Sequence, residues 1–112
     1  EIIMNLIEEQ VAEDAKYDVW QSVYFITDSK QIFKIFSDQS KIKLDFEEDN
    51  IFYFKWYEQD GILAEMVLKP ETLEIECISE EERKKAKKNI EYLLGNLVIH
   101  YKDELIGFND II

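Results

Sequence analysis

Side chains suited to nucleophilic or metal chemistry are scarce in this chain of 112 residues. His100 is the only histidine and Cys77 the only cysteine, whereas a zinc site takes about four clustered Cys and His ligands. A Cys–His nucleophile pair would require the fold to bring Cys77 and His100 together. Cys77 falls on the inward positions of a predicted strand, so we expect a buried hydrophobic residue instead. With no glycine-rich phosphate loop and no assignable Ser–His–Asp set, the sequence predicts no enzyme activity, no cofactor and no metal site.

For two runs of charged residues, a binding site is the alternative to a solvated surface. Acidic side chains surround a predicted turn at residues 45–49, but their spacing is not that of an EF-hand calcium loop, and we expect a solvated turn. The basic run at residues 83–88 belongs to a predicted helix, in which Glu80 lies four residues before Lys84. Such pairs indicate a solvated helix face; the alternative is a local patch for RNA or an acidic partner.

Composition narrows the function further. The net charge is −12, and nucleic-acid binding depends on a basic footprint, so we expect no nucleic-acid partner. An acidic domain stays soluble or meets a basic protein. No apolar run reaches the ~20 residues of a membrane helix, and we expect no signal peptide. A lone cysteine forms no internal disulfide, which fits a cytoplasmic protein. We expect a single small domain; because residue 1 is Glu, not Met, a fragment of a larger protein is the alternative.

The predicted fold is organised around two strands and the helix that follows them. Apolar and β-branched residues predict strands at residues 62–68 and 72–78. Pro70 presets φ for the turn between them. In the second strand, Leu73 and Ile75 alternate with glutamates, which predicts one buried face and one wet face.

The helix is predicted from its ends. Ser79 and Glu82 have the spacing of a capping box, and Gly95 suits a left-handed C-cap. The apolar stripe expected to face the sheet consists of Ala86, Ile90, Leu93, Leu94 and Leu97.

Upstream, period-two patterns predict further strands at residues 41–47 and 51–58. β-branched and aromatic residues predict another at residues 17–26, with both faces apolar. In the strand at 41–47 we expect Ile42, Leu44 and Phe46 to share one buried face. Asp28, with Gln31 three residues later, predicts the start of a short helix that runs from Ser29 to about residue 38 and turns Ile32, Phe33 and Phe36 inward.

The two ends of the chain leave alternatives open. Residues 1–16 have apolar side chains at helical spacing, which predicts a helix docked on the domain's own core or paired with another chain or domain. Residues 98–101 fit either a strand or a continuing helix. The apolar tail up to residue 112 is expected to dock on this domain or on a partner.

Aromatic side chains supply the candidate interaction surface. Tyr and Trp are favoured in protein interfaces. Trp20, Tyr24, Tyr53 and Tyr57 lie on predicted strands, on faces that can lie opposite the main core, and Phe108 belongs to the tail. If the N-terminal helix leaves that second face uncovered, it is the expected binding surface; the alternative is a sheet covered on both faces.

The run from Trp56 to Gly95 resembles a domain of bacterial proteins that carry a SEC-C metal-binding motif. In that pattern an aromatic strand ending in Trp leads to two more strands, a Ser and a charged helix ending in Leu-Leu-Gly. The matching residues are Trp56, Leu63, Ala64, Leu73, Ile75, Glu76, Ser79, Glu82, Arg83, Leu93, Leu94 and Gly95. The cysteine-rich metal motif is absent from this chain, so the resemblance implies a fold and a module of a larger protein, without metal binding.

These patterns predict an α+β fold with a mainly antiparallel sheet of four or five strands and helices packed chiefly on one face. Three functions are compatible with it. The first is a non-catalytic accessory or protein-interaction module that binds a protein or assembles with itself as a homo-oligomer. The second is an acidic inhibitor or immunity-type protein that blocks a basic toxin or nuclease. The third is a small enzyme.

Overall fold

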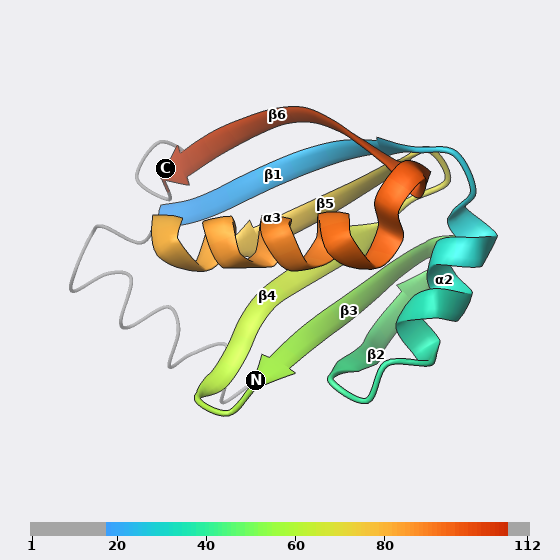
Figure 1. Cartoon of the computed structure of the whole chain (residues 1–112), viewed down its shortest axis with the longest axis horizontal. Helices are drawn as coiled ribbons and strands as arrows, with labels where there is room; N and C mark the ends of the chain where they lie inside the picture. The colour runs from blue at the N-terminus through green and yellow to red at the C-terminus, as the bar shows by residue number, and fades with distance from the viewer. Residues whose placement is uncertain (1–17, 108–112) are drawn as a thin grey trace.

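The computed structural model describes residues 18–107, which form an α+β fold of one six-stranded sheet with two α-helices (Figure 1). The helix predicted at residues 1–16, and the end of the tail with Phe108, lie outside the described residues. The strands are β1 (Asp18–Ile26), β2 (Ile42–Glu48), β3 (Ile51–Glu58), β4 (Gly61–Leu68), β5 (Thr72–Cys77) and β6 (Val98–Gly107). The helices are α2 (Ser29–Ser37) and α3 (Glu80–Leu94), the latter followed by a 3-10 turn, η1 (Gly95–Leu97).

The strand order is β2-β3-β4-β5-β1-β6, and all neighbouring pairs are antiparallel. Strands β2 to β5 follow one another through tight turns. Between β2 and β3, Asp49 and Asn50 have φ angles of 55° and 66°, a left-handed conformation that both residue types tolerate. β1 is the exception to this sequential order, because it lies between β5 and β6, the last two strands of the chain.

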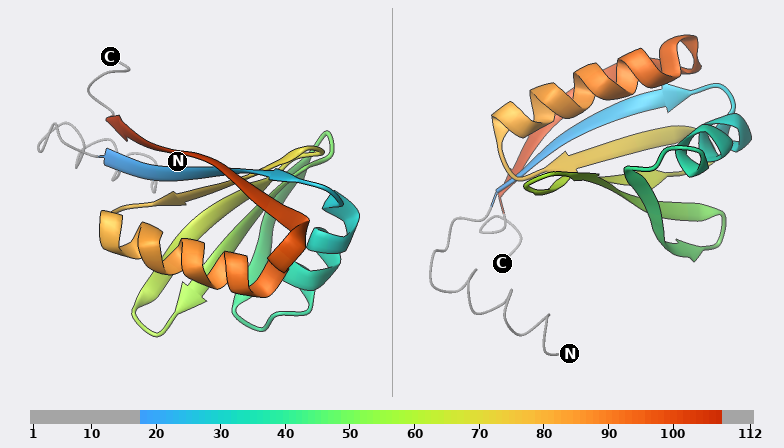
Figure 2. Two further views of the ribbon diagram at one scale, coloured as in Figure 1. Left: turned by 45° about the horizontal axis from the view of Figure 1, so that its top comes forward. Right: turned by 60° about the horizontal axis from the view of Figure 1, so that its bottom comes forward.

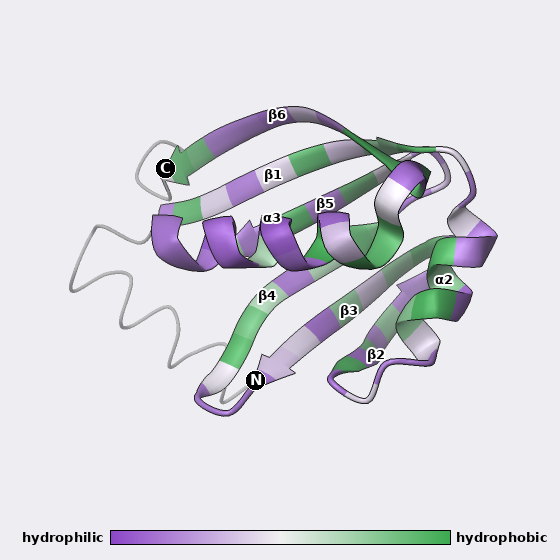
Figure 3. Cartoon of the chain, in the orientation of Figure 1, coloured by the Kyte–Doolittle hydropathy of each residue, from purple (hydrophilic) through white to green (hydrophobic). Residues whose placement is uncertain are grey.

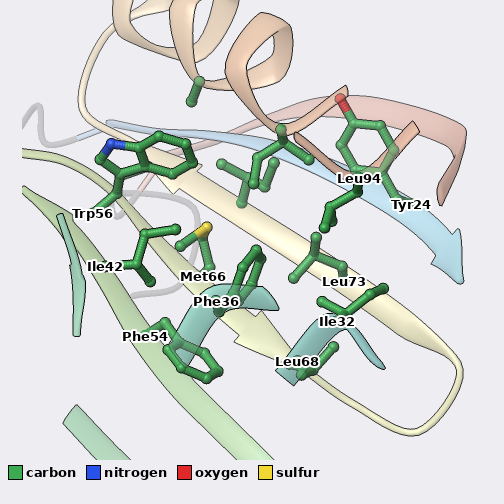
Figure 4. Close-up of a cluster of buried hydrophobic side chains, with 14 of the residues drawn as sticks. Tyr24, Ile32, Phe36, Ile42, Phe54, Trp56, Met66, Leu68, Leu73 and Leu94 are labelled. Carbon is green, nitrogen blue, oxygen red and sulfur yellow. The ribbon is translucent and has the colours of Figure 1, made fainter. Parts of the chain in front are cut away.

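Both helices lie on the same side of the sheet, as the right-hand view of Figure 2 shows. α3 crosses β1, β4 and β5, and α2 lies over β2 and β3. The predicted inward residues of β5, Leu73 and Ile75, have no exposed surface. The largest buried side chains of this layer come from both helices and five strands: Tyr24, Ile32, Phe36, Ile42, Phe54, Trp56, Met66, Leu68, Leu73 and Leu94 (Figure 4).

The predicted helix ends are confirmed. The Asp28 side chain accepts a hydrogen bond from the backbone N–H of Gln31 at 3.1 Å, so it caps α2. The Ser79 hydroxyl accepts one from the N–H of Glu82, also at 3.1 Å, so it caps α3. At the far end of α3, Gly95 has a φ of 54°, which a residue without a side chain adopts at little cost. Local sequence chemistry therefore sets where both helices begin and where α3 ends.

Two predictions about the sheet are wrong. The sheet has six strands, not four or five, because residues 98–107 form β6 and pair with β1 along its length. In β2, Ile42 is buried, but Leu44 and Phe46 are about half exposed. A bulge explains Phe46: Leu44 pairs with Phe54 and Phe46 with Tyr53, so the extra residue, Asp45, shifts Phe46 onto the opposite face. Leu44 lies opposite the buried Phe54 and keeps its predicted face, but it is exposed because β2 is an edge strand.

We expect Ser79→Ala to lower the free energy of unfolding by about 1 kcal/mol, because the first turn of α3 loses the acceptor for the N–H of Glu82. Urea unfolding monitored by circular dichroism measures it. Ser40→Ala is the matched control, since Ser40 is exposed. Equal stability of the two variants would contradict the role of Ser79 as a cap.

Candidate functional site

One face of the sheet is covered by neither described helix, and we call it the open face. Side chains alternate along each strand, so the neighbours of the core residues point to this side. Its large apolar side chains have between about a third and two thirds of their surface exposed: Phe25 46%, Phe46 53%, Tyr53 37%, Tyr57 40%, Ile62 41%, Ile99 60% and Tyr101 55%. The open face therefore presents aromatic and aliphatic surface from five strands.

Ring contacts between neighbouring strands hold part of this surface in place. The centroids of Phe46 and Tyr53 are 5.6 Å apart, which joins β2 to β3. Those of Phe25 and Tyr101 are 4.7 Å apart, which joins β1 to β6. Because the rings contact each other, they lose little side-chain freedom when another surface packs on them.

The structure separates the aromatic residues that the sequence had grouped. Tyr53 and Tyr57 lie on the open face, as expected. Tyr24 lies on the covered face with no exposed surface, and its hydroxyl donates to Glu91 of α3 at 2.8 Å. Trp20 lies on the same covered face beneath the guanidinium of Arg83, 5.1 Å from the ring centroid. Trp20 and Tyr24 are four residues apart in β1, so their side chains point to the same face, beneath α3. Phe108 lies outside the described residues.

Glutamates interrupt the apolar surface at its centre. Glu65 of β4 lies directly opposite Glu76 of β5, an arrangement that is unfavourable for like charges. Burial, together with the charges of Glu65 and Glu74, raises the pKa of Glu76 above its ordinary value. Glu74 is neutralised by Lys69 at 2.8 Å, whereas Glu65 has no ion pair among the described residues.

Two shallow hollows flank this glutamate pair, and both are lined by Glu65 and Glu76. One has a volume of about 330 Å³ and is bordered by Phe46, Tyr53 and Val67. The other has a volume of about 340 Å³ and reaches the first turn of α3, where the remaining residues that line it are Val19, Ile62, Leu63, Ala64, Cys77, Ile78 and Glu82. Lys55 of β3 lies opposite Glu65 on its other side and also lines the first hollow. The open face is thus an apolar surface around a pair of glutamates with one lysine beside them.

On the covered side, Ser22, His100 and Asp103 meet between β1 and β6. The Ser22 hydroxyl donates to Oδ1 of Asp103 at 2.6 Å, and Nε2 of His100 lies 2.8 Å from the same oxygen. Lys87 of α3 donates to Oδ2 at 2.7 Å. Both Ser22 and His100 contact the carboxylate, not each other, and Ser22 has no exposed surface. This arrangement lacks the nucleophile–base contact of hydrolytic triads, and it ties β6 and α3 to β1.

Cys77 and His100 are not brought together. Cys77 of β5 pairs with Trp20 along one edge of β1. His100 of β6 pairs with Tyr24 along the other edge of β1. Four residues along a strand separate the two positions by about 13 Å, before the spacing between strands is added. Cys77 is buried, and burial together with the charge of Glu82 raises the pKa of its thiol to about 12, so a small core residue is the interpretation that the structure supports.

The two charged runs lie where solvated segments are expected. Lys84, Lys85 and Lys88 are exposed, and the outer face of α3 is hydrophilic in Figure 3. Within residues 18–107 no cluster of three or more Asp, Glu, His or Cys side chains has an arrangement that could hold a metal ion. None of the helices in that range is long and apolar enough to cross a membrane.

Sequence reasoning missed two features of this surface. Phe46 was assigned to the core, and the Glu65–Glu76 pair was not recognised, because each depends on how strands pair. Alternation along the strand at 72–78 did predict that Glu76 is turned away from the core, but its partner is fixed only by the register of β4 and β5.

No family model, curated protein or solved structure matches this chain. The resemblance to SEC-C-containing proteins therefore stays a prediction, and inference about function starts from the geometry of the open face.

We expect Asp103→Asn to lower the free energy of unfolding at pH 7 by about 2 kcal/mol, a typical value for hydrogen bonds to a charged group. Although burial alone raises the pKa of Asp103, donation by Lys87, Ser22 and His100 brings it well below the ordinary range. The ionised form thus stabilises the fold above about pH 4, and this contribution is lost as the pH falls toward the lowered pKa. Urea titrations at several pH values measure it.

The control for Asp103→Asn is Asp60→Asn, at an exposed turn position. A loss in Asp103→Asn that is no larger than in Asp60→Asn, or that grows as the pH falls, would contradict the role of the carboxylate.

We expect Glu76→Gln to raise the free energy of unfolding at pH 7 by about 0.5 kcal/mol, because it removes a charge opposed by Glu65. The folded pKa of Glu76 is raised, so the gain is present at neutral pH and disappears as acid protonates the wild-type carboxyl. Glu48→Gln, an exposed β2 position, is the control in the same urea titrations. A destabilised Glu76→Gln variant would show that the pair is not repulsive.

Proposed function

We propose that this chain is a non-catalytic accessory module that binds another protein through the open face. The observation that carries the proposal is the set of large apolar side chains, half exposed, on a sheet face that neither described helix covers. Apolar patches of this kind mark sites of protein interaction. The aromatic rings among them, including Tyr53 and Tyr57, are of the residue types enriched in interfaces.

The size of the face supports this reading. Six strands spaced about 4.8 Å apart, each about eight residues long at a rise of about 3.3 Å per residue, give a footprint of roughly 24 by 26 Å. That is roughly 600 Å², close to the ~800 Å² that each partner contributes to a standard interface. One face of this sheet is therefore of a size that a single partner domain can cover.

The buried positions of the nucleophilic side chains Ser22 and Cys77 support a module without catalysis. Ser22 and Cys77 are buried in the covered layer, and the carboxylate of Asp103 is already shared by three donors. A group that performs acyl transfer must contact both its base and its substrate. Neither Ser22 nor Cys77 meets that requirement in this arrangement.

A second candidate, an inhibitor that covers a basic site on a toxin or nuclease, is favoured by the glutamates on the same surface. Glu65 and Glu76 lie opposite each other on adjacent strands at its centre, and a negative patch steers a protein toward a positive one. The two functions differ in consequence: an inhibitor abolishes its partner's activity on binding, whereas an accessory module leaves that activity in place.

Site-specific photo-cross-linking tests the proposal. We expect p-benzoylphenylalanine at Tyr53 or Tyr57 to give discrete adducts, with a partner protein or with a second copy, when the full chain is irradiated in lysate from its source cells. Tyr92 of α3 is the matched control, because it is 92% exposed on the opposite side of the molecule. Adducts that are equal at all three positions, or that join the open face only to residues 1–17 or 108–112 of the same molecule, would contradict it.

A further inference from the structure

The hollow at the first turn of α3 combines apolar walls with three carboxylates. Val19, Ile62 and Ile78 supply apolar lining, and Glu65, Glu76 and Glu82 supply the charges. Oε1 of Glu82 is buried and has no hydrogen-bond partner among the described residues. An unsatisfied buried carboxylate oxygen is costly to leave without a donor. Together with the opposed pair, the hollow is lined by three acidic groups, and those of Glu65 and Glu76 lie on the open face.

From these contacts we infer that this hollow receives a lysine or arginine side chain of the partner protein that docks on the open face. The inference rests on the proposed function and adds the chemistry of the partner. A long basic side chain lays its methylene stem along apolar surface and keeps its charged head among polar groups. In this hollow the methylene stem contacts Val19 and Ile62, and the charged head pairs with the carboxylates of Glu65 and Glu76.

A metal ion does not fit the same place. Within residues 18–107 the carboxylates do not converge closely enough to form a metal-binding group, whereas an ammonium or guanidinium group distributes several donors over a wider radius. The volume of about 340 Å³ also lies at the lower end of the range for ligand sites. The hollow therefore suits a single extended cationic side chain.

The neighbouring surface indicates a protein and not a free amine. The second hollow shares Glu65 and Glu76 and continues to Phe46 and Tyr53, so a partner that places a cation at the glutamate pair can also bury apolar side chains beside it. Buried aromatic contacts of this kind carry most of the affinity at interfaces. A free polyamine would engage the charges alone.

Charge also selects among the proteins that could occupy the face. The chain carries a net charge of −12, so a second copy would bring its own glutamates against Glu65 and Glu76, and like charges in contact oppose association. A basic partner reverses the sign of that interaction. Binding then relieves the repulsion that the fold tolerates between β4 and β5.

The probe for the test is a short amphipathic peptide, acetyl-Val-Lys-Leu-Arg-Val-Lys-amide, titrated into the isotope-labelled full chain and followed by NMR. We expect shifts at residues 62–65 and 76–82, and an affinity that falls as salt is added. The double variant Glu65→Gln/Glu76→Gln should weaken binding by about tenfold. Its matched control, Glu80→Gln/Glu81→Gln, removes the same charge from the exposed start of α3 and should change binding less than twofold.

Other outcomes overturn the inference. They are the absence of binding, shifts spread over α3, equal loss in both double variants, equal affinity for the peptide with every Lys and Arg replaced by Glu, and spermidine binding as tight as the peptide. Peptide binding that appears only in Lys16→Gln would place this chain's own Lys16 in the hollow, which also overturns it. If open-face cross-links persist while the peptide fails to bind, the partner is not basic, yet the proposed interaction module stands.

Discussion

The packing of α3 on β5 is the interaction on which the rest of the structure depends. Ile90 and Leu94 belong to the same buried cluster as Leu73 and Ile75, and α3 also contacts β1 and β4. This contact ties the sequential strands β4 and β5 to β1, the first strand described. After α3, the chain continues through η1 to the edge of the sheet, where β6 pairs with β1. Because both described helices are used on this side, they leave the other face of the sheet without cover.

The open face is where local rules of stability are broken. Cross-strand neighbours of like charge cost stability, yet Glu65 and Glu76 are directly opposite each other. Aromatic side chains such as Phe46 and Tyr57 remain about half exposed nearby. In the covered layer, by contrast, the charged residue Asp103 has three donors. Departures from local rules that gather on one face of a protein are typical of a functional surface.

The sequence predicts features that depend on residues close together in the chain better than features that depend on the pairing of distant strands. The caps at Asp28 and Ser79 and the hairpins from β2 to β5 arise from residues close in sequence, and they were predicted. For residues 98–101 the sequence left strand and helix as alternatives, and the full length of β6 was not predicted, because its partner β1 lies at the other end of the chain. Its central charges also obscure the period-two pattern, and one of them, Asp103, points inward to Ser22.

The candidate site was predictable only in part, for the same reason. Alternation alone placed Tyr53 and Tyr57 opposite the core, and it turned Glu76 outward. The same rule failed at Phe46, because the bulge at Asp45 reverses the parity of the strand after Leu44. For Trp20 and Tyr24 both faces of the predicted strand were apolar, so parity could not decide which side α3 would cover.

The glutamates of the open face, and the two helices that occupy the opposite face, together restrict what the sheet can bind. A sheet face that is apolar throughout would accept a second copy of the same chain, whereas the glutamates at its centre oppose that pairing and favour a positive partner. The edges of the sheet are less suited to a new strand, because β2 and β6 are both bulged, at Asp45 and Tyr101, and bulges and charged side chains discourage edge pairing. The proposed interaction is therefore better supported by the side chains of the open face than by the backbone of its edges, and recognition through side chains would make a cation on the partner a specific feature.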